Sequence, residues 1–182
     1  MKDDVKTLAY DDILPLQWVE LPALPDALRL ERLSETNVGV LARVATIEER
    51  HRMVGEDGEL EQEINRLHSK MDLLLGLVAS IARQHLKLPD AVEIRLSAYS
   101  LRWKSVAPMP PAGSRIMISL YLNPCIAEPL SLPAVIQEGE GEWVEARFEH
   151  LGATCHSTLE QHVFLHHRRS IAETRILEKT QR

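Results

Sequence analysis

Two histidines near the C-terminus, His162 and His166, are four residues apart, and Cys155 precedes them. Imidazole nitrogens and cysteine thiolates are common zinc ligands, and residues four apart share one face of a helix. No third ligand in the sequence has a diagnostic spacing to these residues. The pattern therefore favours a structural role for both histidines, and the sequence predicts no metal site.

The basic segment HHRRSIAETR gathers Arg168, Arg169 and Arg175. Guanidinium groups bind phosphates and acidic partners through paired N–H donors. The same charges would also compensate the negative C-terminal end of a helix dipole. Both interpretations remain open, so Arg168 and Arg169 are candidate ligand-binding or partner-binding residues.

The sequence also lacks the common motifs of catalytic sites. We find no P-loop, no G-x-S-x-G and no dinucleotide fingerprint. The acidic segment EGEGE reads as a solvated hairpin turn rather than a catalytic pair. The sequence therefore predicts a protein that is not an enzyme and needs no catalytic cofactor.

Charge and composition narrow the class further. The chain has 182 residues and a net charge of −6, which disfavours binding to DNA. Its longest apolar run, LLLGLVASIA, is too short to span a bilayer, and the acidic N-terminus lacks the apolar core of a signal peptide. We therefore expect a cytoplasmic protein without a membrane span, in which Cys125 and Cys155 are reduced thiols.

Three regions follow along the chain. Prolines interrupt residues 1–25, which predicts an extended N-terminal segment with at most a short strand. Residues 26–88 are predicted to be helical, with Asp26 as N-cap of the first helix. Residues 89–182 read as strands followed by a last helix, for which Ser157 is the candidate N-cap.

The strand region contains segments in which apolar and polar residues alternate: VEIRLSAYSLRW, RIMISLYL, LPAVIQ and WVEARFEHL. This period of two predicts β-strands, with the last two joined as a hairpin through EGEGE. Several short strands with turns are typical of a small barrel or sandwich. Trp103 and Trp143 then belong to the barrel or its rim, unless one of them is an exposed binding residue.

The helical region repeats its apolar residues at alternating steps of three and four. The predicted seam positions are Leu30, Leu33, Asn37, Val40, Val44, Ile47, Leu60, Ile64, Leu67, Met71, Leu74, Val78 and Ile81. A repeat of 3.5 residues is typical of a helix that follows a partner helix over its whole length. These positions are therefore the predicted interface of a coiled-coil bundle.

The partner helix could belong to the same chain or to another copy. A simple intramolecular hairpin would satisfy the spacing, but Leu73, Leu75, Leu77 and Ala82 lie outside the seam. One antiparallel partner cannot cover a helix that is apolar on several faces. We therefore expect other copies of the chain, in a bundle of four helices or more.

Three polar residues occupy seam positions. Asn37 would select the register if it met a matching amide, or it would lie at an exposed turn near Gly39. His51 and His85 would make the interface sensitive to pH, or they would sit at the wet ends of the bundle. The spacing does not choose between these alternatives.

Three segments, INRLHSKMDLLLGLVASIAR, VEIRLSAYSLRW and LEQHVFLHHRRSIAETR, together resemble the atypical PilZ domain proteins of plant-pathogenic xanthomonads and related bacteria. The resemblance implies an α+β fold. This fold is a six-stranded antiparallel β-barrel of PilZ type with two long inserted heptad-repeat helices, which form a homo-tetramer, and a C-terminal helix. PilZ domains in general are receptors for cyclic di-GMP. Some members have lost that binding and act through a signalling or pilus-related protein in type IV pilus function, motility or virulence.

Ligand-competent PilZ domains carry R-x-x-x-R before the barrel and D/N-x-S-x-x-G on an early strand. This sequence has no R-x-x-x-R, and RLSAYS is its best match to the second motif. Ser97 keeps the serine, but Arg95 replaces the acidic or amide residue, and a guanidinium cannot accept a hydrogen bond from guanine. The resemblance thus implies a scaffold that acts through protein contacts. The alternative is a receptor that binds cyclic di-GMP in a non-standard way through Arg95, Arg102 or the terminal arginines.

Overall fold

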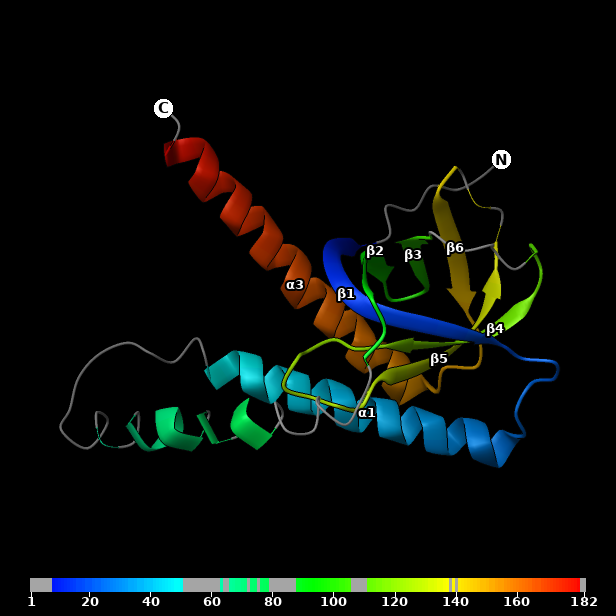
Figure 1. Cartoon of the computed structure of the whole chain (residues 1–182), viewed down its shortest axis with the longest axis horizontal. Coiled ribbons are helices and arrows are strands. Elements are labelled where there is room, and N and C mark those ends of the chain that lie inside the picture. Colours follow the sequence, from blue (N-terminus) through cyan, green and yellow to red (C-terminus); the bar gives the residue numbers. More distant parts are fainter. Residues whose placement is uncertain are drawn as a thin grey trace.

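The computed structural model describes residues 8–50, 63, 66–71, 73–74, 76–78, 88–105, 111–137, 139 and 141–180. The elements are β1 (Ala9–Glu20), α1 (Ala27–Arg50), β2 (Ala91–Ser97), β3 (Ser100–Lys104), β4 (Arg115–Leu120), β5 (Leu130–Ile136), β6 (Trp143–Phe148) and α3 (Ala153–Thr180). The described residues between 63 and 78 are also helical. Figure 1 shows the strands gathered together, with α1 and α3 beside them and α3 running away from the strands toward the C-terminus.

The six strands form a closed antiparallel barrel in the order β1-β2-β3-β6-β5-β4, which confirms the expected fold class. Strand β1 closes the barrel because its first half pairs with β2 and its second half with β4. Pro15 is the last residue paired with β2 and Leu16 the first paired with β4. A proline has no N–H to donate to a neighbouring strand. It is therefore tolerated here, where β1 changes from one partner strand to the other. The segment predicted to be extended with at most a short strand therefore contains β1, a 12-residue strand of the barrel.

Inward-facing apolar side chains fill the barrel. Along β3 and β4 they alternate with residues that are partly or fully exposed, as the period of two predicts. Trp103 is 2% exposed and belongs to this core, whereas Trp143 is half-buried. The largest fully buried core side chains on the strands are Ile94, Leu96, Leu101, Trp103, Ile116, Ile118, Leu120, Leu130 and Leu132. Each such side chain stabilises the fold by about 1.5–3 kcal/mol relative to an exposed one.

The segment VEIRLSAYSLRW is two strands rather than one. The Ser97 hydroxyl accepts hydrogen bonds from the backbone N–H groups of Tyr99 (3.2 Å) and Ser100 (2.8 Å). A serine that bonds to the backbone two and three residues ahead stabilises a tight turn, which here joins β2 to β3. Ser97 is only 5% exposed, so the structure assigns this candidate ligand residue to the hairpin.

Helix α1 begins as predicted. The Asp26 carboxylate accepts a hydrogen bond from the N–H of Arg29 at 2.8 Å, which caps the first turn. The helix lies against β5 and α3 of the same chain. Its inward face places Val40, Leu41 and Val44 in the barrel core.

Helix α3 begins earlier than the sequence predicts. The N–H of His156 donates a hydrogen bond to the carbonyl of Gly152 (2.9 Å), which is the first helical hydrogen bond of α3. Ser157 therefore lies inside the helix and is not its N-cap. The additional turn contains Cys155, which is fully buried. The free energy gained by packing this turn against the rest of the chain outweighs the local preference for a helix that begins at a serine N-cap. No helix in the described part of the chain combines the length and apolar character that crossing a membrane requires.

Candidate functional site

Two of the candidate arginines lie together on the outside of the barrel. Arg95 on β2 and Arg102 on β3 are cross-strand neighbours, and Arg102 also pairs in register with Glu145 on β6. The Arg95 guanidinium lies 3.5 Å from the Asp11 carboxylate, and the Arg102 guanidinium lies 5.3 Å from the ring centre of Trp143. The acidic neighbours compete for the N–H groups that a phosphate would need.

The other two candidate arginines are on α3. Arg168 lies over the ring of Phe164, with 5.6 Å from the guanidinium carbon to the ring centre. Arg169 instead forms an ion pair with Glu48 of α1 at 2.9 Å. Adjacent in sequence, the two arginines therefore have different roles, and Arg169 helps hold α3 against α1.

Glu48 is the centre of a partly buried polar cluster between α1, α3 and β1. His166 Nε2 donates to Glu48 Oε1 at 2.9 Å, and Arg169 Nη1 donates to Glu48 Oε2 at 2.9 Å. Tyr10 of β1 is hydrogen-bonded through its hydroxyl to His162 Nε2 at 3.0 Å. Its ring stacks on His166 with 4.6 Å between ring centres. We call Tyr10, Glu48, His162, His166 and Arg169 the α1–α3 polar cluster.

The environment of the α1–α3 polar cluster fixes its charges. Burial lowers the pKa of His162 to about 3, with a further contribution from the positive charge of His166, so its imidazole is neutral at pH 7. Burial would raise the pKa of Glu48, but the hydrogen bond and charge of His166 and the charge of Arg169 outweigh it and keep the pKa below its ordinary value. Burial also raises the pKa of Tyr10, so its hydroxyl remains protonated.

The sequence identified the two histidines of this cluster but not Glu48 or Tyr10. Glu48 lies one residue after the seam position Ile47 and has no local signal that sets it apart from neighbouring acidic residues. Because 118 residues separate Glu48 from His166, only the packing of α1 on α3 brings the two together.

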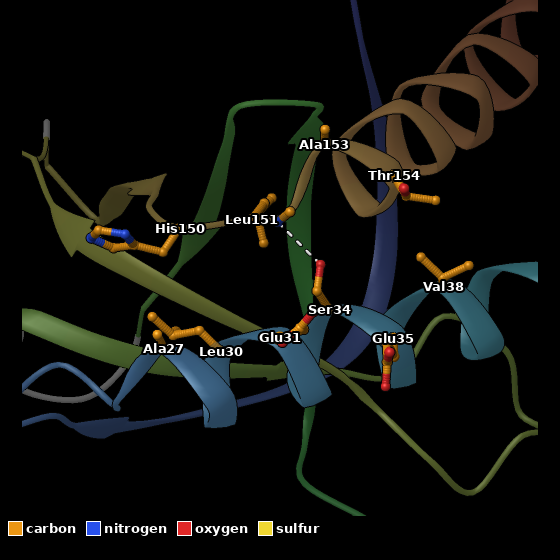
Figure 2. A pocket seen from close by; sticks show the side chains of 11 residues that line it. Ala27, Leu30, Glu31, Ser34, Glu35, Val38, His150, Leu151, Ala153 and Thr154 are labelled. Atoms are coloured by element: carbon orange, nitrogen blue, oxygen red, sulfur yellow. Dashed lines mark hydrogen bonds between the residues drawn. The ribbon is translucent and has the colours of Figure 1, made fainter.

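A groove of about 660 Å³ opens where the first turns of α1 pass the start of α3. Figure 2 shows Ala27, Leu30 and Val38 on one side and His150, Leu151 and Ala153 on the other. Ser34 joins the two sides, since its hydroxyl accepts a hydrogen bond from the N–H of Gly152 at 3.1 Å. The acidic side chains in its lining, Glu31 and Glu35, disfavour a phosphate ligand there.

The helical residues between 63 and 78 expose large apolar side chains. Their exposed fractions run from 44% for Met71 to 65% for Leu73. We call this group the apolar helix surface, and its members are Leu67, Met71, Leu73, Leu74, Leu77 and Val78. Apolar side chains that gather on a surface in this way usually mark a contact with a protein or a membrane.

The predicted seam of α1 needs correction. Val40 and Val44 are fully buried and Asn37 is 1% exposed within a single chain, so these three side chains cannot face another copy. Asn37 bonds to the backbone of Ser131 on β5, which is neither of the roles expected for it. Leu30, Leu33 and Ile47 remain partly exposed, while Leu60, Ile64, Ile81, His51 and His85 lie outside the described residues.

Comparison with known families agrees with this architecture. The family model of the atypical PilZ domain, described as a cyclic di-GMP receptor, matches residues 39–176. The chain belongs to the atypical PilZ domain family. The match spans α1 from its middle, five of the six barrel strands and most of α3.

A solved structure of a pathogenic protein from Xanthomonas campestris is also similar to the chain. That protein is described as a tetrameric PilZ domain self-assembled via a helical bundle. The two chains share 27% sequence identity, the similarity covers 92% of each, and the TM-score is 0.69. No curated protein shows a significant sequence match.

Proposed function

We propose that this PilZ protein is a non-enzymatic cytoplasmic scaffold that assembles as a homo-tetramer and acts through protein contacts. The observation that carries the proposal is the apolar helix surface, which the rest of the described chain leaves exposed. Burying such side chains between copies removes them from water, at about 25 cal/mol per Å² of apolar surface. The similarity to a tetrameric PilZ protein built on a helical bundle supports this assembly.

The partners of the scaffold are proposed to be signalling or pilus-related proteins in cyclic di-GMP signalling, type IV pilus function, motility or virulence. The sequence supports this protein-directed role because the usual nucleotide motifs are degraded. In the structure Ser97 is bonded within the β2–β3 hairpin, and the Asp11 carboxylate, 3.5 Å from the Arg95 guanidinium, competes with a phosphate for its N–H groups.

Multi-angle light scattering of the purified chain tests the assembly. We expect a mass of four chains that persists on dilution to micromolar protein. A mass of one chain at that concentration would refute the scaffold in this form. A stable mass of two chains would support self-assembly but refute the four-chain bundle.

A second candidate is a cyclic di-GMP receptor with a non-standard site on Arg95 and Arg102. Their cross-strand pairing places two guanidinium-bearing residues side by side, and Arg102 already contacts an aromatic ring. Isothermal titration with cyclic di-GMP separates the two candidates. Heat that disappears in Arg95→Ala with Arg102→Ala favours the receptor, whereas absence of heat at high ligand concentration leaves the scaffold.

A further inference from the structure

We infer that Glu48, His162 and His166 form a binding site for a divalent transition metal, which joins α3 to α1. One ligand atom from each of the three residues lies within 4.8 Å of the other two. The site is separate from the apolar helix surface, so it does not depend on the proposed assembly.

The ligand types fit such a metal. Two imidazole nitrogens and one carboxylate oxygen are a frequent ligand set for Zn²⁺, whereas Ca²⁺ and Mg²⁺ prefer oxygen alone. The two histidines are four residues apart on α3, so both rings project from one face of that helix. Their ring centres are 4.3 Å apart, and His162 is 7% exposed.

The separations require only a small adjustment. Zinc bonds of about 2.0–2.1 Å in a tetrahedron place neighbouring ligand atoms about 3.4 Å apart. His166 Nε2 and Glu48 Oε1 are already 2.9 Å apart and share a proton, whose place the metal would take. Drawing ligand atoms within 4.8 Å into the tetrahedron needs side-chain movements of about 1 Å.

Neighbouring groups hold the three ligands in place. Arg169 Nη1 binds Glu48 Oε2, which leaves Oε1 to face His166. The Tyr10 ring stacks on His166, and its hydroxyl bonds to His162 Nε2 at 3.0 Å, so His162 would offer its other ring nitrogen, Nδ1, to the metal. Groups that orient ligands in this way commonly raise metal affinity by 10- to 100-fold.

The positive charge of Arg169 sets a limit on affinity. It neutralises part of the charge that Glu48 would offer to the metal, so we expect binding weaker than at a site without a nearby cation. The fourth coordination position would be left to water. Because Glu48 lies on α1 and both histidines lie on α3, the bound metal would link the two helices.

Cobalt titration tests the site in the full-length chain after removal of metals with a chelator. We expect one Co²⁺ per chain, with the visible absorption bands of tetrahedral coordination, and displacement of Co²⁺ by Zn²⁺. The variants His166→Gln and Glu48→Gln should each weaken binding by about tenfold or more. The variant His68→Gln removes an exposed helical histidine outside the cluster and should bind as the wild type does.

Circular dichroism shows whether each variant is folded, and thermal unfolding provides a second readout. Zn²⁺ should raise the Tm of the wild type by more than that of His166→Gln at the same metal concentration, because the metal binds the folded state and binds the variant more weakly. The inference is overturned if the wild-type chain binds no Co²⁺, or if both glutamine variants bind it as tightly as the wild type.

Discussion

At the residue scale, Asn37 shows how one side chain replaces a missing strand. Ser131 on β5 pairs with Ser119 on β4, but β6 pairs with β5 only from Ala134 onward. The Asn37 side chain fills the gap, since its amide donates to the Ser131 carbonyl and its oxygen accepts from the Ser131 N–H, both at 2.8 Å. The partly buried backbone of Ser131 thereby has hydrogen-bond partners on the side that β6 does not pair with.

The variant Asn37→Ala should lower the free energy of unfolding by about 1–3 kcal/mol, because it removes the hydrogen-bond partners of two partly buried backbone groups. Urea denaturation at one fixed protein concentration measures the change. The neighbouring variant Thr36→Ala, at an exposed position, is the control and should change stability by no more than about 0.5 kcal/mol. Equal stability of the two variants would show that Asn37 does not complete the sheet.

The two cysteines should differ in reactivity. Cys155 is buried, and burial raises the pKa of its thiol despite hydrogen bonds from Ser34 and Asn37. Cys125 is exposed. Because the thiolate is the reactive form, a colorimetric disulfide reagent at neutral pH should modify Cys125 rapidly and Cys155 only after denaturation. The variant Cys125→Ser should remove the rapid phase, and a rapid phase that survives it would contradict the assignment.

At the scale of elements, the junction between α1 and α3 depends on close approach at Gly152. A Cβ atom built on Gly152 would lie 2.5 Å from Ser34 Oγ and 3.3 Å from Ser34 Cβ. The α1–α3 polar cluster joins the same two helices farther along, through Glu48 and Arg169. The two helices are thus held together at two separate places.

The variant Gly152→Ala should destabilise the protein by about 1–3 kcal/mol, because the added methyl group forces α3 away from α1. The double variant with Ser34→Ala removes the nearer of the two clashing atoms and should recover part of that loss. Thermal unfolding of the four proteins of this cycle measures the coupling. If the destabilisations of the two single variants simply add in the double variant, the two side chains are not in contact.

At the scale of the whole molecule, the apolar helix surface is the proposed contact between copies of the chain. The double variant Leu67→Asp with Leu74→Asp should dissociate the oligomer into single chains, since each change would bury an unpaired charge in the contact. Light scattering measures the mass. The loss should exceed a factor of ten in the association constant, which corresponds to about 1.4 kcal/mol.

The matched control is Leu28→Asp on α1, where the leucine is similarly exposed and an acidic residue suits the first helical turn. It should leave the mass of the assembly unchanged. Assembly that survives the double change at Leu67 and Leu74 would exclude this surface as the contact and with it the proposed bundle.

The sequence by itself determined the features that rest on neighbouring residues. Asp26 caps α1 because a carboxylate reaches an N–H three residues ahead, and β5 and β6 pair as a hairpin because EGEGE is a short polar connection. The stripe of apolar residues on α1 correctly predicted a helix with a buried face. It did not reveal what covers that face, since an apolar helix face can pack equally well against a barrel or against a second helix.

The tertiary structure alone decided the remaining features, which all join distant residues. Strand β1 closes the barrel at both edges, Asn37 meets Ser131 across 94 residues, and Glu48 meets His166 across 118. No local pattern encodes such pairs, because the free energy that forms them comes from packing of the whole chain. A sequence shows which faces must be buried, and only the fold shows what they are buried against.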